Sequence, residues 1–408
     1  MTDIKQLLYI SPQFPAVSLV FEQNEMLGIQ NSGVNITIAS CRNSSCTEAH
    51  EFAIPLLKHV IYPNYNNIFL GFVLLLFRSP ISLLRILTFT LIASINILAI
   101  KKNLAALLFT LGWYPYLLNK EQSFDWIHAD FGKGTATVAL MLSEVLKCPF
   151  SFKVHAFDIY DKSLEYVDFL KKIKIKCAIL IFSEHEYGKQ KLLEISPKCE
   201  KKIKVNYTAI RPNDFQELIP VLTSKKFIAL GRLVSKKGFD VLIKASAILN
   251  NRGENFVVDI YGYGLEEQNL KKLIKINNLQ EIVNLKGKYK NEQLPEMLKD
   301  CIALVAPSVI DKNGDMDGIP TVIYEAMALG RAIITSKLSG IPEVIKENIN
   351  GYLCEPGNIE ELAEKMHFLL LNPHISLKMG IEGRKLVEKN HDYITNAKLL
   401  LNQMNNYV

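Results

Sequence analysis

A long stretch in the first third of the chain contains no negative charge. No Asp or Glu occurs between residues 52 and 120, although the 408-residue chain has 41 acidic and 47 basic residues. Because these cations are sparse and lie among apolar residues, they do not form the dense basic stripe of a nucleic-acid-binding protein. The stretch carries the whole formal net charge of +6 through six basic residues: Lys58, Arg78, Arg85, Lys101, Lys102 and Lys120.

Cysteines in a pattern that would form disulfides or a zinc site are also missing. The seven cysteines are scattered, and no His/Cys group has zinc-ligand spacing. Such a set is typical of reduced thiols in a cytosolic protein. Asp3 and the shortness of the apolar run Leu7–Ile10 argue against a signal peptide. We therefore expect a cytoplasmic, metal-independent protein.

The apolar runs within residues 68–113 are too short for a confident membrane span, which needs roughly 20 residues. Phe69–Phe77 is followed by Arg78 and Pro80, and Ile86–Ile100 is interrupted only by Thr, Ser and Asn. One interpretation is an interfacial patch on an anionic membrane surface, at the inner face of the plasma membrane. The other is a pair of buried helices. We favour the membrane surface because the acid-free stretch is so long.

Apolar runs typical of buried strands alternate with helical patterns through both halves of the chain. Examples are Val34–Ala39 in the first half and Phe227–Leu230 in the second. Together with the chain length, this alternation predicts an α/β protein with two doubly wound, Rossmann-like domains facing across a cleft. We expect the domains to span residues 1–210 and 211–390.

The segment Gly314–Gly330 carries the densest group of candidate functional residues, with the sequence GDMDGIPTVIYEAMALG. Pro320 suits the first position of a helix, and Gly330 suits its C-terminal stop. A loop that enters a helix this way presents backbone N–H groups suited to a phosphate. The carboxylates of Asp317 and Glu325 would repel a phosphate, but they could hold hydroxyls of an attached sugar or ribose. An ordinary helix N-terminus with surface acids is the alternative.

A second motif joins a predicted strand to a predicted helix at Gly231–Gly238. Arg232 and Lys237 lie five residues apart across this turn. The two side chains could hold a diphosphate from two sides, Arg by bidentate contact and Lys as a point charge. A surface turn with two solvated cations is the alternative.

These motifs resemble the donor site of retaining glycosyltransferases of family 4, which have the GT-B fold. There, an acidic residue and a Glu eight positions later flank the start of a helix, as Asp317 and Glu325 do here. The G-R-x-x-x-x-K-G pattern of the family matches Gly231–Gly238. The variant found at Gly314–Thr321 resembles the branch that makes bacterial exopolysaccharide and colanic-acid-type glycans. The resemblance covers nearly the whole chain.

The first half also resembles this branch. Phe124–Gly132 matches a strand and turn of the family, with His128 at the first conserved His and Asp130 in place of the second. A strand that ends in His155-Ala-Phe-Asp-Ile-Tyr160 is specific to the branch. The resemblance implies that the backbone carbonyl of His155 faces the reacting sugar carbon. It places on the acceptor side Phe14, Ser18, His128 and Asp130.

The function implied by the resemblance is metal-independent, retaining transfer of a sugar from a nucleotide diphosphate to a glycan or glycolipid acceptor, without a bound cofactor. Arg232 and Lys237 would stabilise the leaving diphosphate, while Glu325 would hold the ribose and Asp317 the sugar. The helix at 391–408 would pack back on the first domain. The catalytic residues would be His155, Asp317, Arg232 and Lys237. Those that bind the donor would be Arg232, Lys237, Gly287, Gly318, Ile319, Pro320, Thr321 and Glu325.

Two other functions compete with this interpretation. A phosphorylase on the same fold would need a pyridoxal-binding Lys, and no recognisable site for one is present. A catalytically silent sugar-nucleotide-binding or membrane-scaffold protein is the other, because Asp317 stands where the family usually has Glu and Asp130 where it has His.

Overall fold

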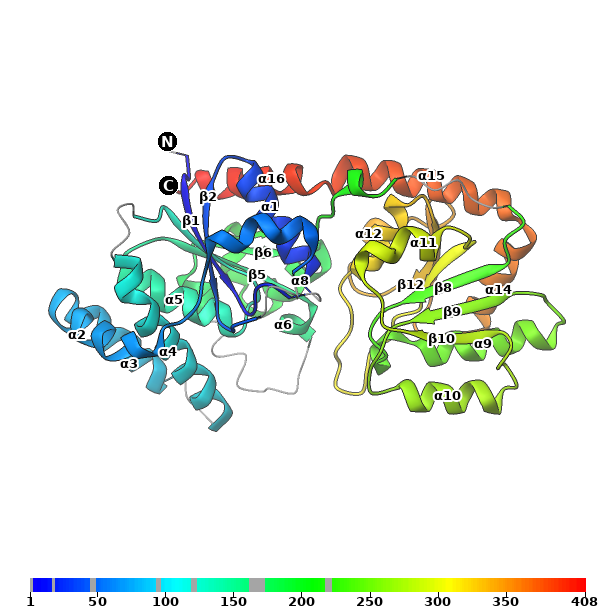
Figure 1. The fold of residues 1–408 in the computed structure, drawn as a ribbon, viewed down its shortest axis with the longest axis horizontal. Helices are drawn as coiled ribbons and strands as arrows, with labels where there is room; N and C mark the ends of the chain where they lie inside the picture. Colours follow the sequence, from blue (N-terminus) through cyan, green and yellow to red (C-terminus); the bar gives the residue numbers. More distant parts are fainter. Residues whose placement is uncertain are drawn as a thin grey trace. The chain divides into compact units, whose positions relative to one another are not determined.

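The computed structural model describes residues 3–408 except 17–18, 45–48, 93–96, 119–122, 161–172 and 217–221. The chain forms two compact units (Figure 1). The first runs to residue 209 apart from 160–162 and includes 393–408. The second contains 160–162 and 210–392.

A parallel sheet forms the centre of the first unit. Its strand order among the described residues is β3-β2-β1-β4-β5-β6-β7, with Leu8 of β1 beside Thr37 on one side and Ile127 on the other. The order reverses between β1 and β4, where ligands bind in sheets of this kind. The strands are β1 Gln6–Ser11, β2 Asn35–Ser40, β3 Val60–Ile61, β4 Trp126–Ala129, β5 Phe150–Val154, β6 Leu180–Ser183 and β7 Ile203–Val205.

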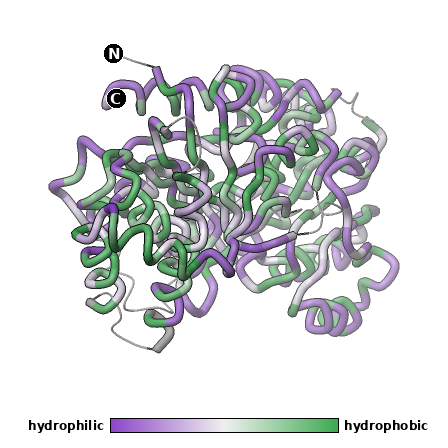
Figure 2. The backbone as a smooth tube through the Cα atoms, turned by 60° about the vertical axis from the view of Figure 1, so that its left-hand side comes forward, coloured by the Kyte–Doolittle hydropathy of each residue, from purple (hydrophilic) through white to green (hydrophobic). Residues whose placement is uncertain are grey.

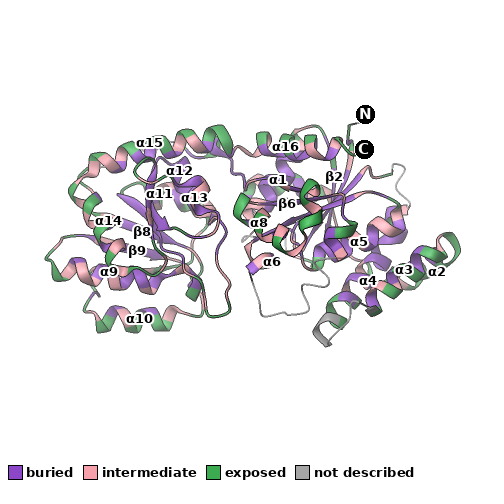
Figure 3. Cartoon of the chain, turned by 180° about the vertical axis from the view of Figure 1, so that it is seen from behind, coloured by how far each residue is buried: buried purple, intermediate pink, exposed green. Residues whose placement is uncertain are grey.

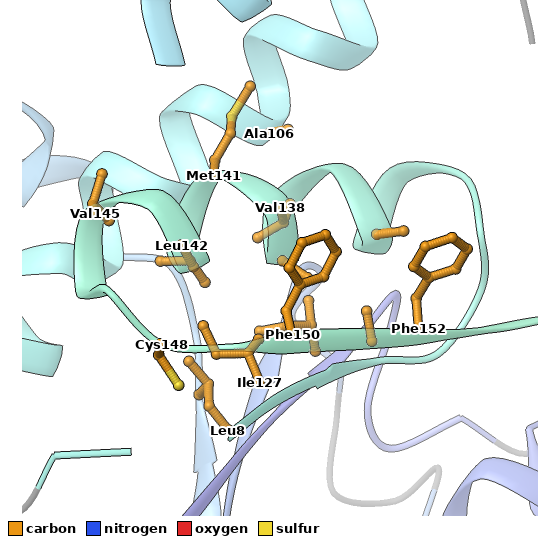
Figure 4. Packing of buried hydrophobic residues seen from close by; sticks show 14 of the residues in the cluster. Leu8, Ala106, Ile127, Val138, Met141, Leu142, Val145, Cys148, Phe150 and Phe152 are labelled. Carbon is orange, nitrogen blue, oxygen red and sulfur yellow. The ribbon is translucent and has the colours of Figure 1, made fainter. Parts of the chain in front are cut away.

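Successive side chains of β1 alternate between the two faces of this sheet, as a strand buried on both sides requires. Leu8 and Ile10 join the core on one face, and Leu7 and Tyr9 join the core on the other. On the first face, α5 (Gly134–Leu146) packs over the strands, with Leu142 pointing toward them and Met141 pointing away toward Ala106 of α4 (Figure 4).

Helices α1 (Val20–Asn31) and α16 (Tyr393–Asn405) lie together on the other face of this sheet. The two helices approach closely at Gly28, where a Cβ atom would lie 2.4 Å from the carbonyl oxygen of Tyr393. The last segment of the chain therefore completes the first unit. Helices α6 (Ala156–Tyr160) and α8 (Glu186–Ile195) follow β5 and β6.

The acid-free stretch forms three helices, α2 (Ile68–Arg78), α3 (Pro80–Ile92) and α4 (Ile97–Leu118), at the side of the first unit (Figure 1). Leu75, Leu83 and Trp113 are buried in the core beneath them. Other apolar side chains of the same helices are exposed (Figure 3). The interpretation as buried helices therefore holds for one face only. Within the described residues, no helix combines the length and apolar composition needed to cross a membrane.

The second unit has its own parallel sheet, with the order β10-β9-β8-β11-β12-β13 among the described residues. The order reverses between β8 and β11, so both sheets are doubly wound and the predicted fold class is confirmed. The strands are β8 Lys226–Leu230, β9 Val257–Tyr261, β10 Val283–Gly287, β11 Ala303–Ala306, β12 Ala332–Ser336 and β13 Gly351–Cys354. The helices are α9 Phe239–Asn251, α10 Glu267–Ile276, α11 Leu294–Leu298, α12 Thr321–Ala328, α13 Ile341–Val344, α14 Ile359–Leu371 and α15 Pro373–Asn390.

Candidate active site

The G-R-x-x-x-x-K-G segment connects β8 to α9 at the carboxyl end of the second sheet. Gly238 has a positive φ of 65°, and a Cβ atom there would lie 1.9 Å from the carbonyl oxygen of Pro307. Only glycine suits both the conformation and the contact. This close approach holds the turn before α9 against the loop that follows β11.

The contact between these loops joins two lysines to two aspartates, Lys236, Lys237, Asp315 and Asp317, which we call the Lys237 cluster. The Lys237 Nζ atom lies 2.8 Å from Oδ2 of Asp317, and the same oxygen accepts a hydrogen bond of 2.9 Å from Ser308. The Lys236 Nζ atom lies 2.8 Å from Asp315 and 3.7 Å from Oδ1 of Asp317. Asp317 is therefore balanced by two cations.

Burial alone would raise the pKa of Asp317, but the charges of Lys237 and Lys236 outweigh burial and lower this pKa below its usual value. The carboxylate therefore stays ionised at neutral pH. Arg232 is exposed, and its guanidinium makes no ion pair or hydrogen bond with any residue that the structure describes. Its guanidinium is available to a ligand.

Helix α12 begins directly after the acidic loop. Pro320 lies one position earlier than the sequence suggested, because it is the N-cap and Thr321 is the first helical residue. Gly330 has a positive φ of 71° just beyond the helix, as expected of a C-terminal stop. Gly318 and Ile319 precede this helix start, so the N–H groups of its first turn point out of the helix end beside Asp317.

Glu325 is buried in α12 and accepts a hydrogen bond of 2.6 Å from the side chain of Asn291. Gly287 is the last residue of β10, the edge strand that β9 and β8 separate from β11. The second unit thus brings Arg232, Lys237 and Asp317 to one edge of the sheet. Motif matching did not identify the partners Lys236, Asp315, Ser308 and Asn291.

A second group of charged residues lies at the carboxyl end of the first sheet. We call it the His155 cluster, and it contains Glu22, Glu25, Asp130, Lys153, His155 and Glu184. His155 follows β5 directly, Asp130 follows β4 and Glu184 follows β6. The sheet order β4-β5-β6 therefore puts His155 between the two carboxylates.

His155 uses both ring nitrogens within the cluster. The Nε2 atom lies 2.6 Å from Asp130 Oδ1, and Nδ1 lies 2.9 Å from Glu184 Oε1. Burial would lower the pKa of His155, but Asp130 and Glu184 raise this pKa well above its usual value. His155 is thus an imidazolium with no nitrogen left for a sugar hydroxyl. Its carbonyl oxygen accepts a hydrogen bond of 2.9 Å from the backbone N–H of Asp158.

Glu25 contacts Lys153, another member of the His155 cluster. It forms an ion pair with Lys153 and accepts a hydrogen bond of 2.8 Å from Tyr9. Lys153 also donates to Asn206 at 2.9 Å. Burial would raise the pKa of Glu25, but Lys153 and His128 lower it far below the usual value.

Two carboxylate oxygens of the cluster have no hydrogen-bond partner among the described residues: Oε1 of Glu22 and Oδ2 of Asp130. Both residues line a small pocket together with Phe21 and Lys153. Burial, and then the charge of Asp130, raise the pKa of Glu22 well above its usual value. This pocket suits a ligand hydroxyl or a water molecule better than an anion.

The four residues expected on the acceptor side differ in whether their side chains are open to a ligand. Phe14 and His128 are 0% exposed, so neither side chain is open to a ligand in this structure. Asp130 reaches the pocket, and Ser18 falls outside the described residues. No group of three or more His, Cys, Asp or Glu in the described part of the chain is arranged to hold a metal ion.

Sequence comparison shows which known proteins the second unit is similar to. Residues 210–386 match the model of glycosyl transferases group 1. The amylovoran biosynthesis glycosyltransferase AmsK of Erwinia amylovora is 36% identical over 175 residues, which are 42% of this chain and 43% of that protein. The putative colanic acid biosynthesis glycosyltransferase WcaL of Escherichia coli is 34% identical over 144 residues, 35% of this chain and 36% of that protein. The chain thus spans less than half the length of these relatives.

Structural comparison extends over nearly the whole chain. Anabaena Alr3699/HepE, solved in complex with UDP and glucose, has a TM-score of 0.71 at 15% identity and covers 98% of this chain and 100% of that one. Sucrose-phosphate synthase of Thermosynechococcus elongatus has a TM-score of 0.73 at 15% identity, with 98% of each chain covered. At this identity the likeness shows the fold alone, which is that of the GT-B glycosyltransferases.

Proposed function

We propose that the protein is a retaining glycosyltransferase of family 4, since residues 210–386 match the model of glycosyl transferases group 1 and the chain has the GT-B fold. The observation that carries this proposal is the meeting of Arg232, Lys237 and Asp317 at the carboxyl end of the second sheet. A nucleotide diphosphate sugar has the groups that this site would bind, namely a diphosphate, a ribose and a sugar. The UDP and glucose in the HepE complex support this choice of donor.

Arg232 and Lys237 would hold the diphosphate and stabilise the charge that grows on it as the sugar leaves. Preorganised cations of this kind act most strongly in the transition state, because the charge develops there. N–H groups around Gly318 and Thr321 would assist from the start of α12. Glu325 would accept hydrogen bonds from the ribose, and the backbone at Gly287 would lie beside the base. The residues supply this stabilisation without a metal ion.

The Lys237–Asp317 ion pair has a consequence for donor binding. When Lys237 turns to the diphosphate, Asp317 keeps a compensating charge because Lys236 already lies 3.7 Å from it. Asp317 would then remain an ionised acceptor for sugar hydroxyls. The leaving diphosphate would accept the proton of the attacking hydroxyl on the same face of the sugar, and the anomeric configuration would be retained.

His155 would act through its backbone and not through its ring, because both ring nitrogens are bound to Asp130 and Glu184. The two ion pairs fix the ring and therefore the peptide that carries it. The carbonyl oxygen of residue 155 would face the positively charged sugar carbon of the transition state.

The acceptor would be a glycan, linked to a lipid, in the assembly of a bacterial surface polysaccharide. The names of the relatives AmsK and WcaL support this assignment, since they refer to amylovoran and colanic acid. A lipid-linked acceptor would place the reaction on the cytoplasmic side of the plasma membrane.

The test uses the purified full chain with a panel of UDP-, GDP- and dTDP-sugars. Release of the nucleotide diphosphate would identify the donor, and NMR of the product would give the anomeric configuration. The matched control for a Lys237→Ala variant is Lys244→Ala, which removes a lysine of α9. A donor that binds but is neither hydrolysed nor transferred would favour the silent sugar-nucleotide-binding alternative. Failure of every nucleotide sugar to bind would contradict both.

A further inference from the structure

The helices of the acid-free stretch carry an unusual concentration of exposed apolar side chains. We call these the α2–α3 patch: Phe69, Leu70, Phe77, Ile81, Leu84 and Leu91. Three of them are largely exposed, Phe69 at 78%, Phe77 at 81% and Leu91 at 76%. Figure 2 colours most of the described length of these helices as hydrophobic.

The opposite sides of these helices are firmly packed. Leu75 of α2 and Leu83 and Ile86 of α3 are buried in the core of the first unit. The patch is thus held on a fixed base, and its exposure does not come from loose packing of the helices. Helices that are apolar on all sides normally lie inside a protein or against lipid. One side of α2 and α3 satisfies the first condition, and the other side has no protein against it among the residues that the structure describes.

The charges beside the patch identify what covers it. Arg78 follows Phe77 directly, and Lys101 and Lys102 follow the exposed Ile100 in α4; all three cations are exposed. Arg85 differs, because its Nη1 atom lies 3.2 Å from Glu144 of α5. Residues 52–120 themselves contain no Asp or Glu. A second copy of the chain would therefore meet like charges across this face, whereas an anionic surface would meet complementary ones.

We propose that the α2–α3 patch binds the surface of an anionic lipid bilayer, with Arg78, Lys101 and Lys102 at the headgroups. The apolar side chains enter the boundary between headgroups and acyl chains, and the helices lie on the bilayer without crossing it. This inference does not require the proposed transferase activity, since it stands on the exposure and charge of the first unit alone.

The experiment measures binding of the full chain to phosphatidylcholine vesicles with and without phosphatidylglycerol, by flotation. We expect binding to the anionic vesicles that weakens with added salt. The triple variant Phe69→Ser, Phe77→Ser, Ile81→Ser should lower the partition coefficient at least about tenfold, because apolar burial supplies much of the affinity. The control replaces three exposed apolar residues of the second unit, Leu265, Ile276 and Leu371, with Ser and should bind like the parent.

A second variant tests the charges separately and avoids any loss of apolar packing. Replacing Arg78, Lys101 and Lys102 with Gln should lower anionic binding about tenfold or more and leave binding to neutral vesicles unchanged. Its control replaces Lys271, Lys272 and Lys275 of α10, which are also exposed.

Three results would overturn the proposal. One is a folded parent that binds neither kind of vesicle. Another is binding that both triple variants retain in full. The third is a parent dimer that the serine variant dissociates, since a second copy would then cover the patch. Nucleotide-sugar turnover measured on the same preparations keeps this result separate from the fate of the proposed function.

Discussion

The two charged clusters lie at equivalent places in the two sheets but have opposite balances of charge. The Lys237 cluster and the neighbouring Arg232 contain three cations and two aspartates. The His155 cluster contains four carboxylates and two cations. An excess of cations suits an anionic ligand, while buried carboxylates with unpartnered oxygens suit a neutral ligand rich in hydroxyl groups. The same architecture thus carries one edge rich in cations and one rich in buried carboxylates.

The clusters also differ in how many of their charged groups are already occupied. Both ring nitrogens of His155 are used within the first unit, whereas the guanidinium of Arg232 in the second unit has no partner among the described residues. A cation whose donors are all satisfied fixes the protein around it. A cation with free donors can bind a ligand. We therefore expect mutations in the Lys237 cluster to affect turnover most, and mutations in the His155 cluster to affect stability most.

The largest effect should come from Arg232→Ala and Lys237→Ala. Each change removes a charge that would stabilise the leaving diphosphate, and losing one such donor typically costs about a hundredfold or more in kcat. Steady-state turnover of the nucleotide sugar checks this, with thermal unfolding as the measure of an intact fold. Near-normal turnover in both variants would exclude the diphosphate assignment.

His155→Leu should lower the free energy of unfolding by about 3 kcal/mol, because it leaves Asp130 and Glu184 buried without their shared cation. Urea denaturation measures this change. Adding Asp130→Asn to the variant removes one of the uncompensated charges and should restore part of the loss. If His155→Leu alone is as stable as the parent, the ion pairs do not hold this region together.

Asp317→Asn should lose much of the activity, since an amide cannot replace an ionised acceptor, whereas Asp317→Glu should retain most of it. The Asn variant keeps the size of Asp317 and the Glu variant keeps its charge. Comparing the changes in kcat and KM shows whether the loss of activity lies in the reaction or in binding. Equal activity of the Asn variant and the parent would mean that Asp317 does not bind the sugar through its charge.

The two clusters should lose stability at opposite ends of the pH range. The pKa of His155 is raised, so its contribution is complete below the ordinary value near 6.5 and declines as pH rises through the raised pKa. The pKa of Asp317 is lowered, so its contribution is complete above its ordinary value and declines as pH falls through the lowered pKa. NMR titration of the ring carbons should find His155 protonated at neutral pH, and a neutral ring there would contradict the two ion pairs.

A chelator should have the smallest effect, namely none on turnover of the nucleotide sugar. Arg232 and Lys237 supply the positive charge that a metal ion would otherwise bring to a diphosphate. Turnover before and after treatment with EDTA checks this expectation. A loss that added Mg²⁺ or Mn²⁺ restores would show that the two cations are insufficient.

The sequence was most informative where a proposed site lies in a short, continuous segment. Arg232 with Lys237, and Asp317 with Glu325, belong to such segments, and alternating strands and helices predicted the two doubly wound sheets. The pairs between Lys236 and Asp315, and between His155 and Glu184, join loops that are separate in the sequence. Strand order decides these contacts, and no local pattern reveals it.

Apolar composition was a weaker guide. It did not show that Phe14 and His128 lie wholly inside the first unit, because a buried residue and a ligand contact can occupy the same motif. In α2 every residue except Arg78 is apolar, and in α3 apolar residues are in the majority, so periodicity did not distinguish the packed face from the exposed one. Only the packing of Leu75 and Leu83 against the core made that distinction.

The position of α16 has a consequence for the order in which the protein can be made. Leu400 and Met404 of this helix fill the core beside α1, and Asn405 accepts a hydrogen bond of 3.0 Å from the backbone of Ile4. Every residue of the second unit is synthesised before these side chains exist. A ribosome-bound chain can therefore fold its second sheet while the first still lacks part of its core. The face of α1 that packs against α16 is therefore completed only after the second unit has been made.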